Sequence, residues 1–163
     1  MRKFKKIDKK NTIISTEIYP TKYKIKYNNN IVLLGVGGNM GDSIRLFHRL
    51  FYFFKKSSLL NILESSIILK NPPFGYLNQS DFYNTTLLIS TKLSPKELLR
   101  YILKVENHFG RVRKFQDGPR TLDIDIILYN KISIKSPKLT IPHPKYRQRD
   151  SVQIPMSKMK GLR

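Results

Sequence analysis

The sequence predicts a single α+β domain of the ferredoxin-like type, a β-α-β-β-α-β sandwich with helices packed on an antiparallel sheet. Three observations predict this order. An apolar run over residues 31–36 precedes a helical pattern, and residues 61–69 and 82–91 then have the composition of strands. A second helical pattern follows, and from residue 121 apolar and polar side chains alternate again. A chain of 163 residues suffices for one core of this kind.

We expect the chain to divide into an extension, residues 1–30, and a main domain, residues 31–163. Thr12–Tyr19 and Tyr23–Tyr27 alternate weakly, which predicts one or two strands, and Asn28-Asn29-Asn30 ends this pattern. The extension is therefore expected to pack on the core without forming a domain of its own.

Both helices carry start signals. The first has a stripe of apolar side chains from Ile44 to Phe54, with Asp42 or Ser43 as its N-cap. The second begins at the capping box Ser94-Pro95-Lys96-Glu97 and ends at Gly110.

Composition limits the location and the partners. The chain has no Cys, which excludes disulfides and thiolate metal sites, and it has no run of about 18 apolar residues. Its basic N-terminus lacks the apolar segment of a signal peptide, so we expect a cytoplasmic protein. The net charge of +20 suits polyanions such as nucleic acids, anionic membranes or phosphorylated metabolites. The absence of Ala and the abundance of Lys, Ile and Asn favour genome composition as the main source of this charge.

The strand that follows Gly118-Pro119 carries two acids on one face. Alternation predicts that Asp123 and Asp125 lie opposite an apolar set formed by Leu122, Ile124, Ile126 and Leu128. Two carboxylates roughly 6.5–7 Å apart repel each other unless they hold divalent cations, and carboxylate oxygens suit Mg²⁺. We expect this strand to be central and its acids to face the helix-free side of the sheet. From these residues alone, two solvated acids on an edge strand are an equally good interpretation.

Three further segments suggest a site for phosphate and a planar ligand. The loop before the Asp strand is rich in cations, at Arg111, Arg113, Lys114 and Arg120. His143 lies between two prolines, and the nearby cations should lower the pKa of its imidazole. Asn84, on the third strand, could pair with a heterocycle edge, although a structural Asn is the more common case.

Six blocks of the chain together form a distinctive set: Gly37-Gly38-Asn39-Met40, Asn71-Pro72-Pro73-Phe74-Gly75, Asp81-Phe82-Tyr83-Asn84, Gly110-Arg111-Val112-Arg113, Gly118-Pro119-Arg120-Thr121-Leu122-Asp123-Ile124-Asp125 and Ile141-Pro142-His143-Pro144. In this order they resemble the successive signatures of the 6-hydroxymethyl-7,8-dihydropterin pyrophosphokinase family. The resemblance implies an ATP- and Mg²⁺-dependent enzyme of folate biosynthesis. It would transfer pyrophosphate from ATP to the pterin hydroxymethyl group and release AMP. We expect a monomer that needs neither nucleic acid nor membrane.

The resemblance also implies residue roles. Asp123 and Asp125 would hold two Mg²⁺ ions, and together with Arg111, Arg113 and Arg120 they form the expected catalytic group. The expected ATP-binding residues are Glu106, Arg111, Arg113, Arg120, Ile126, Thr140, His143 and Arg149. The expected pterin-binding residues are Asn39, Asn71, Pro72, Pro73, Phe74, Phe82 and Asn84.

One departure from the family concerns the pterin side. Where relatives commonly carry an aromatic side chain that stacks on the pterin, this chain has Ser151. We hypothesise that Phe74, or an aromatic residue of the extension, takes over this role. The alternative function is an RNA-binding module, since RNA-recognition domains share the predicted topology. Such modules expose aromatic side chains on central strands, where this chain would place its two acids.

Overall fold

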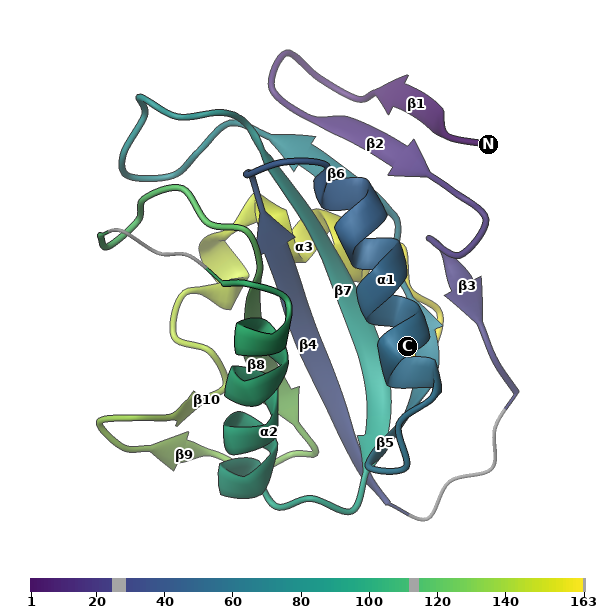
Figure 1. The fold of residues 1–163 in the computed structure, drawn as a ribbon, viewed down its shortest axis with the longest axis vertical. Coiled ribbons are helices and arrows are strands. Elements are labelled where there is room, and N and C mark those ends of the chain that lie inside the picture. Colours follow the sequence, from purple (N-terminus) through teal and green to yellow (C-terminus); the bar gives the residue numbers. More distant parts are fainter. Residues whose placement is uncertain (25–28, 112–114, 163) are drawn as a thin grey trace.

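The computed structural model describes residues 1–24, 29–111 and 115–162, and within these the predicted α+β order is confirmed (Figure 1). The main domain contains β4 (Asn30–Gly38), α1 (Ser43–Lys55), β5 (Leu60–Ser65), β6 (Ile68–Asn71), β7 (Phe82–Thr91), α2 (Pro95–His108) and β8 (Asp123–Tyr129). The predicted strand over residues 61–69 is thus two strands, β5 and β6, which pair with different parts of the long strand β7.

One antiparallel sheet runs through the molecule in the order β1-β2-β6-β7-β4-β8, with β5 also pairing to β7. The strand that carries Asp123 and Asp125 is β8, which lies at the end of this order. The prediction of a central Asp strand is therefore wrong. Central positions belong to β4 and β7, whose nine-residue register from Asn30↔Thr91 to Gly38↔Tyr83 is the longest pairing in the sheet.

The strict alternation predicted for the Asp strand breaks at Ile127. The β4–β8 register shifts so that Leu33 faces Leu128 while Leu34 faces Ile126, which leaves Ile127 as the extra residue of a bulge. Before the bulge, Ile124 and Ile126 pack toward α1 and α2, as predicted. Beyond it, Leu128 packs on the opposite face, contrary to the prediction, and Tyr129 takes its place toward the helices.

Helices cover both faces of the sheet. In Figure 1, α1 and α2 lie on the near face, over a core that contains Leu34, Phe47, Phe51 and Ile102 among many others. The far face carries α3 (Asp150–Ser157), preceded by η1 (Tyr146–Gln148) and a small hairpin of β9 (Ile134–Lys135) and β10 (Thr140–Ile141). The face of the Asp residues is therefore not helix-free. Helix α3 was not predicted, because its short sequence includes Pro155 and has little periodicity.

The predicted helix caps are confirmed. The Asp42 carboxylate accepts the backbone N–H of Arg45 at 3.0 Å, so Asp42 and not Ser43 is the N-cap of α1. Ser94 and Glu97 form the reciprocal capping box of α2. Gly110, just past the end of α2, has a φ of 70°, a value that glycine adopts without strain.

The N-terminal residues extend the sheet. β1 (Lys3–Lys6) and β2 (Thr12–Ser15) form a hairpin, and β2 pairs with β6, while β3 (Thr21–Lys22) pairs with β5. Between them, the buried Tyr19 hydroxyl donates a hydrogen bond to the Phe47 carbonyl of α1 at 2.9 Å. These contacts tie the N-terminal strands to the helix layer as well as to the sheet.

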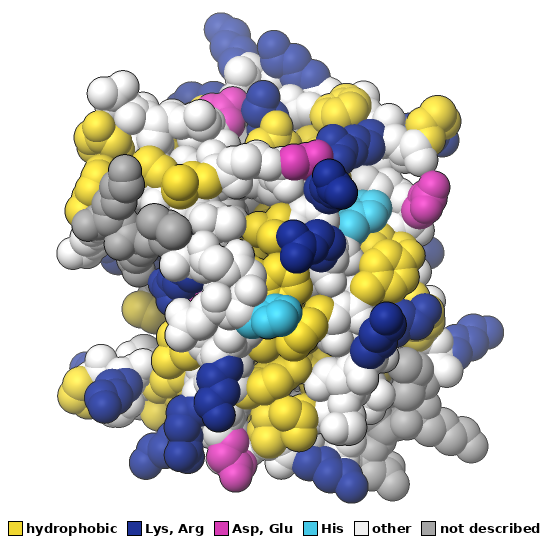
Figure 2. Space-filling view, in the orientation of Figure 1, with side chains coloured by type: hydrophobic (Ala, Val, Ile, Leu, Met, Phe, Trp, Pro, Cys, Tyr) yellow, Lys and Arg dark blue, Asp and Glu magenta, His cyan; other side chains and the backbone are white. Residues whose placement is uncertain are grey.

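Lys and Arg side chains are spread widely over the face shown in Figure 2, with few acidic side chains among them. In the part of the chain that the structure describes, no helix combines the length and apolar character needed to cross a membrane.

Candidate active site

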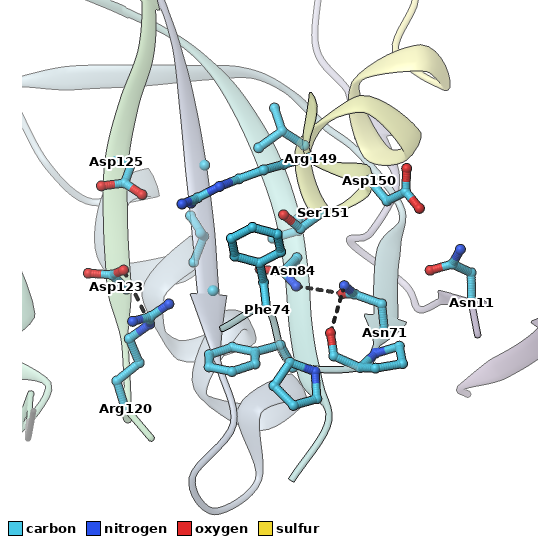
Figure 3. Close-up of a pocket in the computed structure, with 18 of the residues that line it drawn as sticks. Asn11, Asn71, Phe74, Asn84, Arg120, Asp123, Asp125, Arg149, Asp150 and Ser151 are labelled. Atoms are coloured by element: carbon cyan, nitrogen blue, oxygen red, sulfur yellow. Dashed lines mark hydrogen bonds and ion pairs between the residues drawn. The ribbon is translucent and has the colours of Figure 1, made fainter. Parts of the chain in front are cut away.

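A cavity of about 330 Å³ lies between the sheet and α3 (Figure 3). Seven parts of the chain line it: the strands β4, β7 and β8, the loop after β6, the loop before β8, the start of α3, and the turn between β1 and β2. Predicted site residues in its wall are Asn71, Pro72, Pro73, Phe74, Phe82, Asn84, Arg120, Asp123, Asp125 and Arg149.

One end of the cavity carries the two acids of β8. Figure 3 shows Asp123 and Asp125 one above the other on the same side of the strand. Asp123 is ion-paired twice: Arg111 Nη2 lies 2.9 Å from its Oδ1, and Arg120 Nε lies 3.3 Å from its Oδ2. Arg120 also stacks over the Phe82 ring, with 4.9 Å between the guanidinium carbon and the ring centre. Arg111 and Arg120 thus lie beside Asp123.

Glu106 joins α2 to this end of the site. Its side chain is only 1% exposed, its Oε1 accepts the Ile124 N–H at 2.6 Å, and its Oε2 pairs with Arg111. Burial raises the pKa of Glu106 from 4.5 to about 7, although the hydrogen bond from Ile124 and the charge of Arg111 act in the opposite direction. Glu106 therefore positions Arg111 from helix α2, which packs against β8.

Asp125 and His143 influence each other's ionisation. Burial, followed by the charge of Asp123, raises the pKa of Asp125. Burial lowers the pKa of His143, and Arg149 acts in the same direction, while Asp125 opposes it. The direction predicted for His143 is confirmed, but burial and not the neighbouring cations is its main cause. The imidazole is therefore neutral at neutral pH. The backbone N–H of His143 donates to the Ile127 carbonyl at 2.9 Å and fixes the position of the residue beside β8.

The acid pair fits magnesium that is shared with a phosphate ligand. Among the described residues, no group of three or more His, Cys, Asp or Glu side chains could coordinate a metal ion by itself. Mg²⁺ in nucleotide sites is typically held by one or two carboxylates, with phosphates and water completing its octahedral shell. Within the same residues, the Asp125 carboxylate has no hydrogen bond or ion pair to the protein, whereas Asp123 would have to exchange an arginine contact for a metal.

The other end of the cavity is formed by amides. Asn84 Nδ2 donates to Asn71 Oδ1 at 2.8 Å, and Asn71 Nδ2 in turn donates to the Pro72 carbonyl at 3.2 Å. Space for the Asn84 side chain depends on Gly37, since a Cβ there would lie 2.7 Å from Asn84 Oδ1. This chain of hydrogen bonds fixes which amide atoms remain available to a ligand.

Phe74 lies at the mouth of the cavity. Its side chain is 71% exposed, and the Arg149 guanidinium carbon lies 5.8 Å from its ring centre. The aromatic residues of the extension lie elsewhere: Phe4 is exposed, Tyr19 and Tyr23 pack against the core, and Tyr27 is outside the described residues. Of the two hypothesised replacements for the missing aromatic, the geometry therefore favours Phe74.

Other predicted residues lie away from the cavity wall. Asn39 accepts the Arg120 N–H at 3.0 Å and donates its own N–H to the Arg120 carbonyl at 3.0 Å, so it braces the arginine loop. The Ile126 side chain is buried in the core, and Thr140 lies on β10 next to the His143 segment. Arg113 and Lys114 lie outside the described residues.

Two residues of the extension, Lys10 and Asn11, line the cavity together with Gln148 and Asp150, and no sequence pattern indicated this. They precede β2 by one or two positions, and only the pairing of β2 with β6 brings them to the site. Strand pairing between distant segments could not be predicted from weak alternation.

Comparison with known proteins identifies the family. A family model described as 7,8-dihydro-6-hydroxymethylpterin-pyrophosphokinase matches residues 33–161. The chain belongs to this family. It is accordingly a pterin pyrophosphokinase, which transfers pyrophosphate to hydroxymethyldihydropterin in folate biosynthesis.

Several relatives are similar to this chain over most of its length. A 2-amino-4-hydroxy-6-hydroxymethyldihydropteridine pyrophosphokinase of Helicobacter pylori is 39% identical over 148 residues, which cover 89% of this chain and 91% of that protein. The protein of the same name from Bacillus subtilis is 34% identical over 131 residues, or 80% of this chain and 78% of that one. The folic acid synthesis protein FOL1 of Dictyostelium discoideum is 42% identical over 130 residues, which cover 79% of this chain and 19% of that protein.

Proposed function

We propose that ATP supplies the pyrophosphoryl group in a Mg²⁺-dependent reaction within this cavity. The hydroxymethyl oxygen of the pterin would attack the β-phosphorus of ATP, forming a new O–P bond. The bond from that phosphorus to the oxygen bridging it to the α-phosphate would break, AMP would leave, and the hydroxyl proton would pass to solvent. The observation that carries this proposal is that one cavity joins the amide pair Asn71 and Asn84 to the acid pair Asp123 and Asp125.

The acid end would hold two Mg²⁺ ions through Asp123 and Asp125. Mg²⁺ supplies charge neutralisation on the phosphate oxygens and alignment of the attacking and leaving groups. Asp125 is available for this role, because it has no partner among the described residues. Asp123 would be released from one of its two arginines, which would then be free to bind phosphate.

The cationic residues would bind the triphosphate. The Arg149 Nε atom is buried and has no hydrogen-bond partner in the part of the chain that the structure describes, a state that a phosphate oxygen would relieve. Arg111 and Arg120 lie beside Asp123, and we assign Arg113 the same role from its place in the signature. His143, neutral and next to Asp125, would donate one hydrogen bond to a phosphate oxygen. Glu106 positions Arg111, and Thr140 and Ile126 would lie near the nucleotide.

The amide end would bind the pterin. Asn84, oriented by Asn71, offers a donor and an acceptor to the heterocycle edge, and backbone groups of the Pro72-Pro73-Phe74 segment add further polar contacts. The Phe74 ring would cover one face of the pterin. Phe82 supports this end indirectly, because its ring lies beneath Arg120.

The test is AMP formation from ATP with and without hydroxymethyldihydropterin and Mg²⁺. Wild-type protein should form AMP only when all three components are present. Asp125→Asn should lower kcat by at least about 100-fold, because a lost metal ligand removes several kcal/mol of transition-state stabilisation. Asp81→Asn is the matched control, since Asp81 forms only a loose surface pair with Lys70 at 3.7 Å. AMP formation that survives EDTA, or near-normal activity of Asp125→Asn, would contradict the proposal.

We further propose that the enzyme acts as a cytoplasmic monomer, with residues 1–30 as an extension of the domain formed by residues 31–163. In this proposal the groups of the site come from one chain, and neither nucleic acid nor membrane is required. Light scattering behind size-exclusion chromatography should give the monomer mass of 19.2 kDa.

A further inference from the structure

The turn between β1 and β2 forms part of the wall of the cavity. Asn11 lines the cavity and is nonetheless only 5% exposed. The antiparallel register pairs Thr12 with Lys70, and therefore brings Asn11 next to Asn71, one step beyond the end of the ladder. The family match begins at residue 33, so this part of the wall lies outside the matched region.

The Asn11 side chain is held in one orientation by Asp8. One carboxylate oxygen of Asp8 accepts the backbone N–H groups of Lys10 at 2.7 Å and Asn11 at 2.8 Å. Its other oxygen accepts Asn11 Nδ2 at 2.8 Å, and the Ile7 N–H closes the turn on the Asn11 carbonyl at 3.0 Å. The Nδ2 group of Asn11 is therefore already committed to a partner within the turn.

The remaining polar atom of this side chain is an unused acceptor. Asn11 Oδ1 accepts no hydrogen bond from the described residues and, unlike Arg149 Nε, it is not a fully enclosed atom. An acceptor that remains accessible in this way can receive an N–H group from a ligand. Figure 3 shows Asn11 beyond Asn71, on the side remote from Asp123 and Asp125. The three amides thus lie at the end of the cavity that would take the heterocycle, away from the phosphate end.

We propose that Asn11 is a specificity-determining residue that binds the pterin. Its Oδ1 accepts a hydrogen bond from the amino group or ring N–H of the pyrimidinone part, next to the contacts made by Asn84. The N-terminal extension is then a part of the substrate site, and it adds polar recognition to a cavity that has Ser151 in place of an aromatic residue. This inference rests on the proposed placement of the pterin at the amide end.

The experiment compares Asn11→Ala and Asn11→Leu with Ile13→Ala in the full-length chain. Both Asn11 variants remove the acceptor, and Leu retains the volume of the side chain in case Ala loosens the turn. Ile13→Ala shortens a half-buried side chain of β2 and loosens the same hairpin, but it leaves Asn11 and its partner Asp8 in place. Initial rates of AMP formation give KM for the pterin, KM for ATP and kcat, and thermal melting reports on stability.

We expect both Asn11 variants to raise KM for the pterin about threefold to tenfold, the loss of one hydrogen bond, with KM for ATP within about twofold of wild type. Ile13→Ala should leave KM for the pterin within about twofold, even where its melting temperature falls as much as that of Asn11→Ala. An unchanged pterin KM in the Asn11 variants, or an equal rise in Ile13→Ala, would overturn the inference and leave the proposed function intact. A wild-type chain without pterin-dependent AMP formation would overturn both.

Discussion

Glu106→Gln should make the stability of the protein less sensitive to pH. Glutamine has nearly the same shape and keeps an oxygen that can accept the Ile124 N–H, but it cannot ionise. In the wild-type protein, the pKa of Glu106 rises from 4.5 to about 7 on folding, because the carboxyl is buried under β8. A group whose pKa is raised by folding stabilises the native state fully below its unfolded pKa, and this contribution is lost as the pH rises through the folded pKa.

The magnitude follows from the two pKa values. A rise from 4.5 to about 7 corresponds to a cost of about 3 kcal/mol for the ionised carboxylate, at about 1.4 kcal/mol per pKa unit. Most of this cost develops between pH 5 and pH 8. The free energy of unfolding of Glu106→Gln should therefore increase, relative to wild type, by about 2–3 kcal/mol over that range. The attraction to Arg111 favours the ionised carboxylate, and it is already contained in the folded pKa of about 7.

Urea denaturation followed by circular dichroism measures this difference at pH 5, 6, 7 and 8, with EDTA present and nucleotide absent. Glu17→Gln serves as the control, because it removes one exposed acid from the same strongly basic chain. The reasoning fails if the difference between Glu106→Gln and wild type is constant across this range, or if it changes in the opposite direction.

Two other substitutions test the packing around the site. Gly37→Ala would place a Cβ 2.7 Å from Asn84 Oδ1, so the Asn84 amide must move. KM for the pterin should then rise about tenfold, while the melting temperature changes little. An unchanged pterin KM would show that the orientation of Asn84 is unimportant. Tyr19→Phe removes the buried hydrogen bond to the Phe47 carbonyl and should lower the free energy of unfolding by about 1 kcal/mol without changing kcat, as measured by urea denaturation and AMP release. A loss of activity in Tyr19→Phe at full stability would contradict this structural role.

Features that depend on neighbouring residues could be predicted from the sequence. The capping box at Ser94, the N-cap Asp42 and the stop at Gly110 each involve side chains within a few positions of one another, so local pattern determines them. The shared face of Asp123 and Asp125 follows from the two-residue period of a strand, whatever its neighbours are. The signature blocks then indicated the family, and the comparisons confirm it.

Features that depend on which distant segments meet were decided only by the tertiary structure. The edge position of β8 and the bulge at Ile127 result from pairing with β4, some ninety residues earlier in the chain. Asn11 reaches the amide end of the cavity because β2 adds to β6, although nothing in its local sequence distinguishes it from a turn residue. The Asp pair was therefore determined by the sequence as a local motif. The sequence alone did not determine which residues surround this pair or which segments form the opposite wall of the cavity. These depend on hydrogen bonds between strands that are far apart in the chain, and such pairing leaves no local sequence pattern.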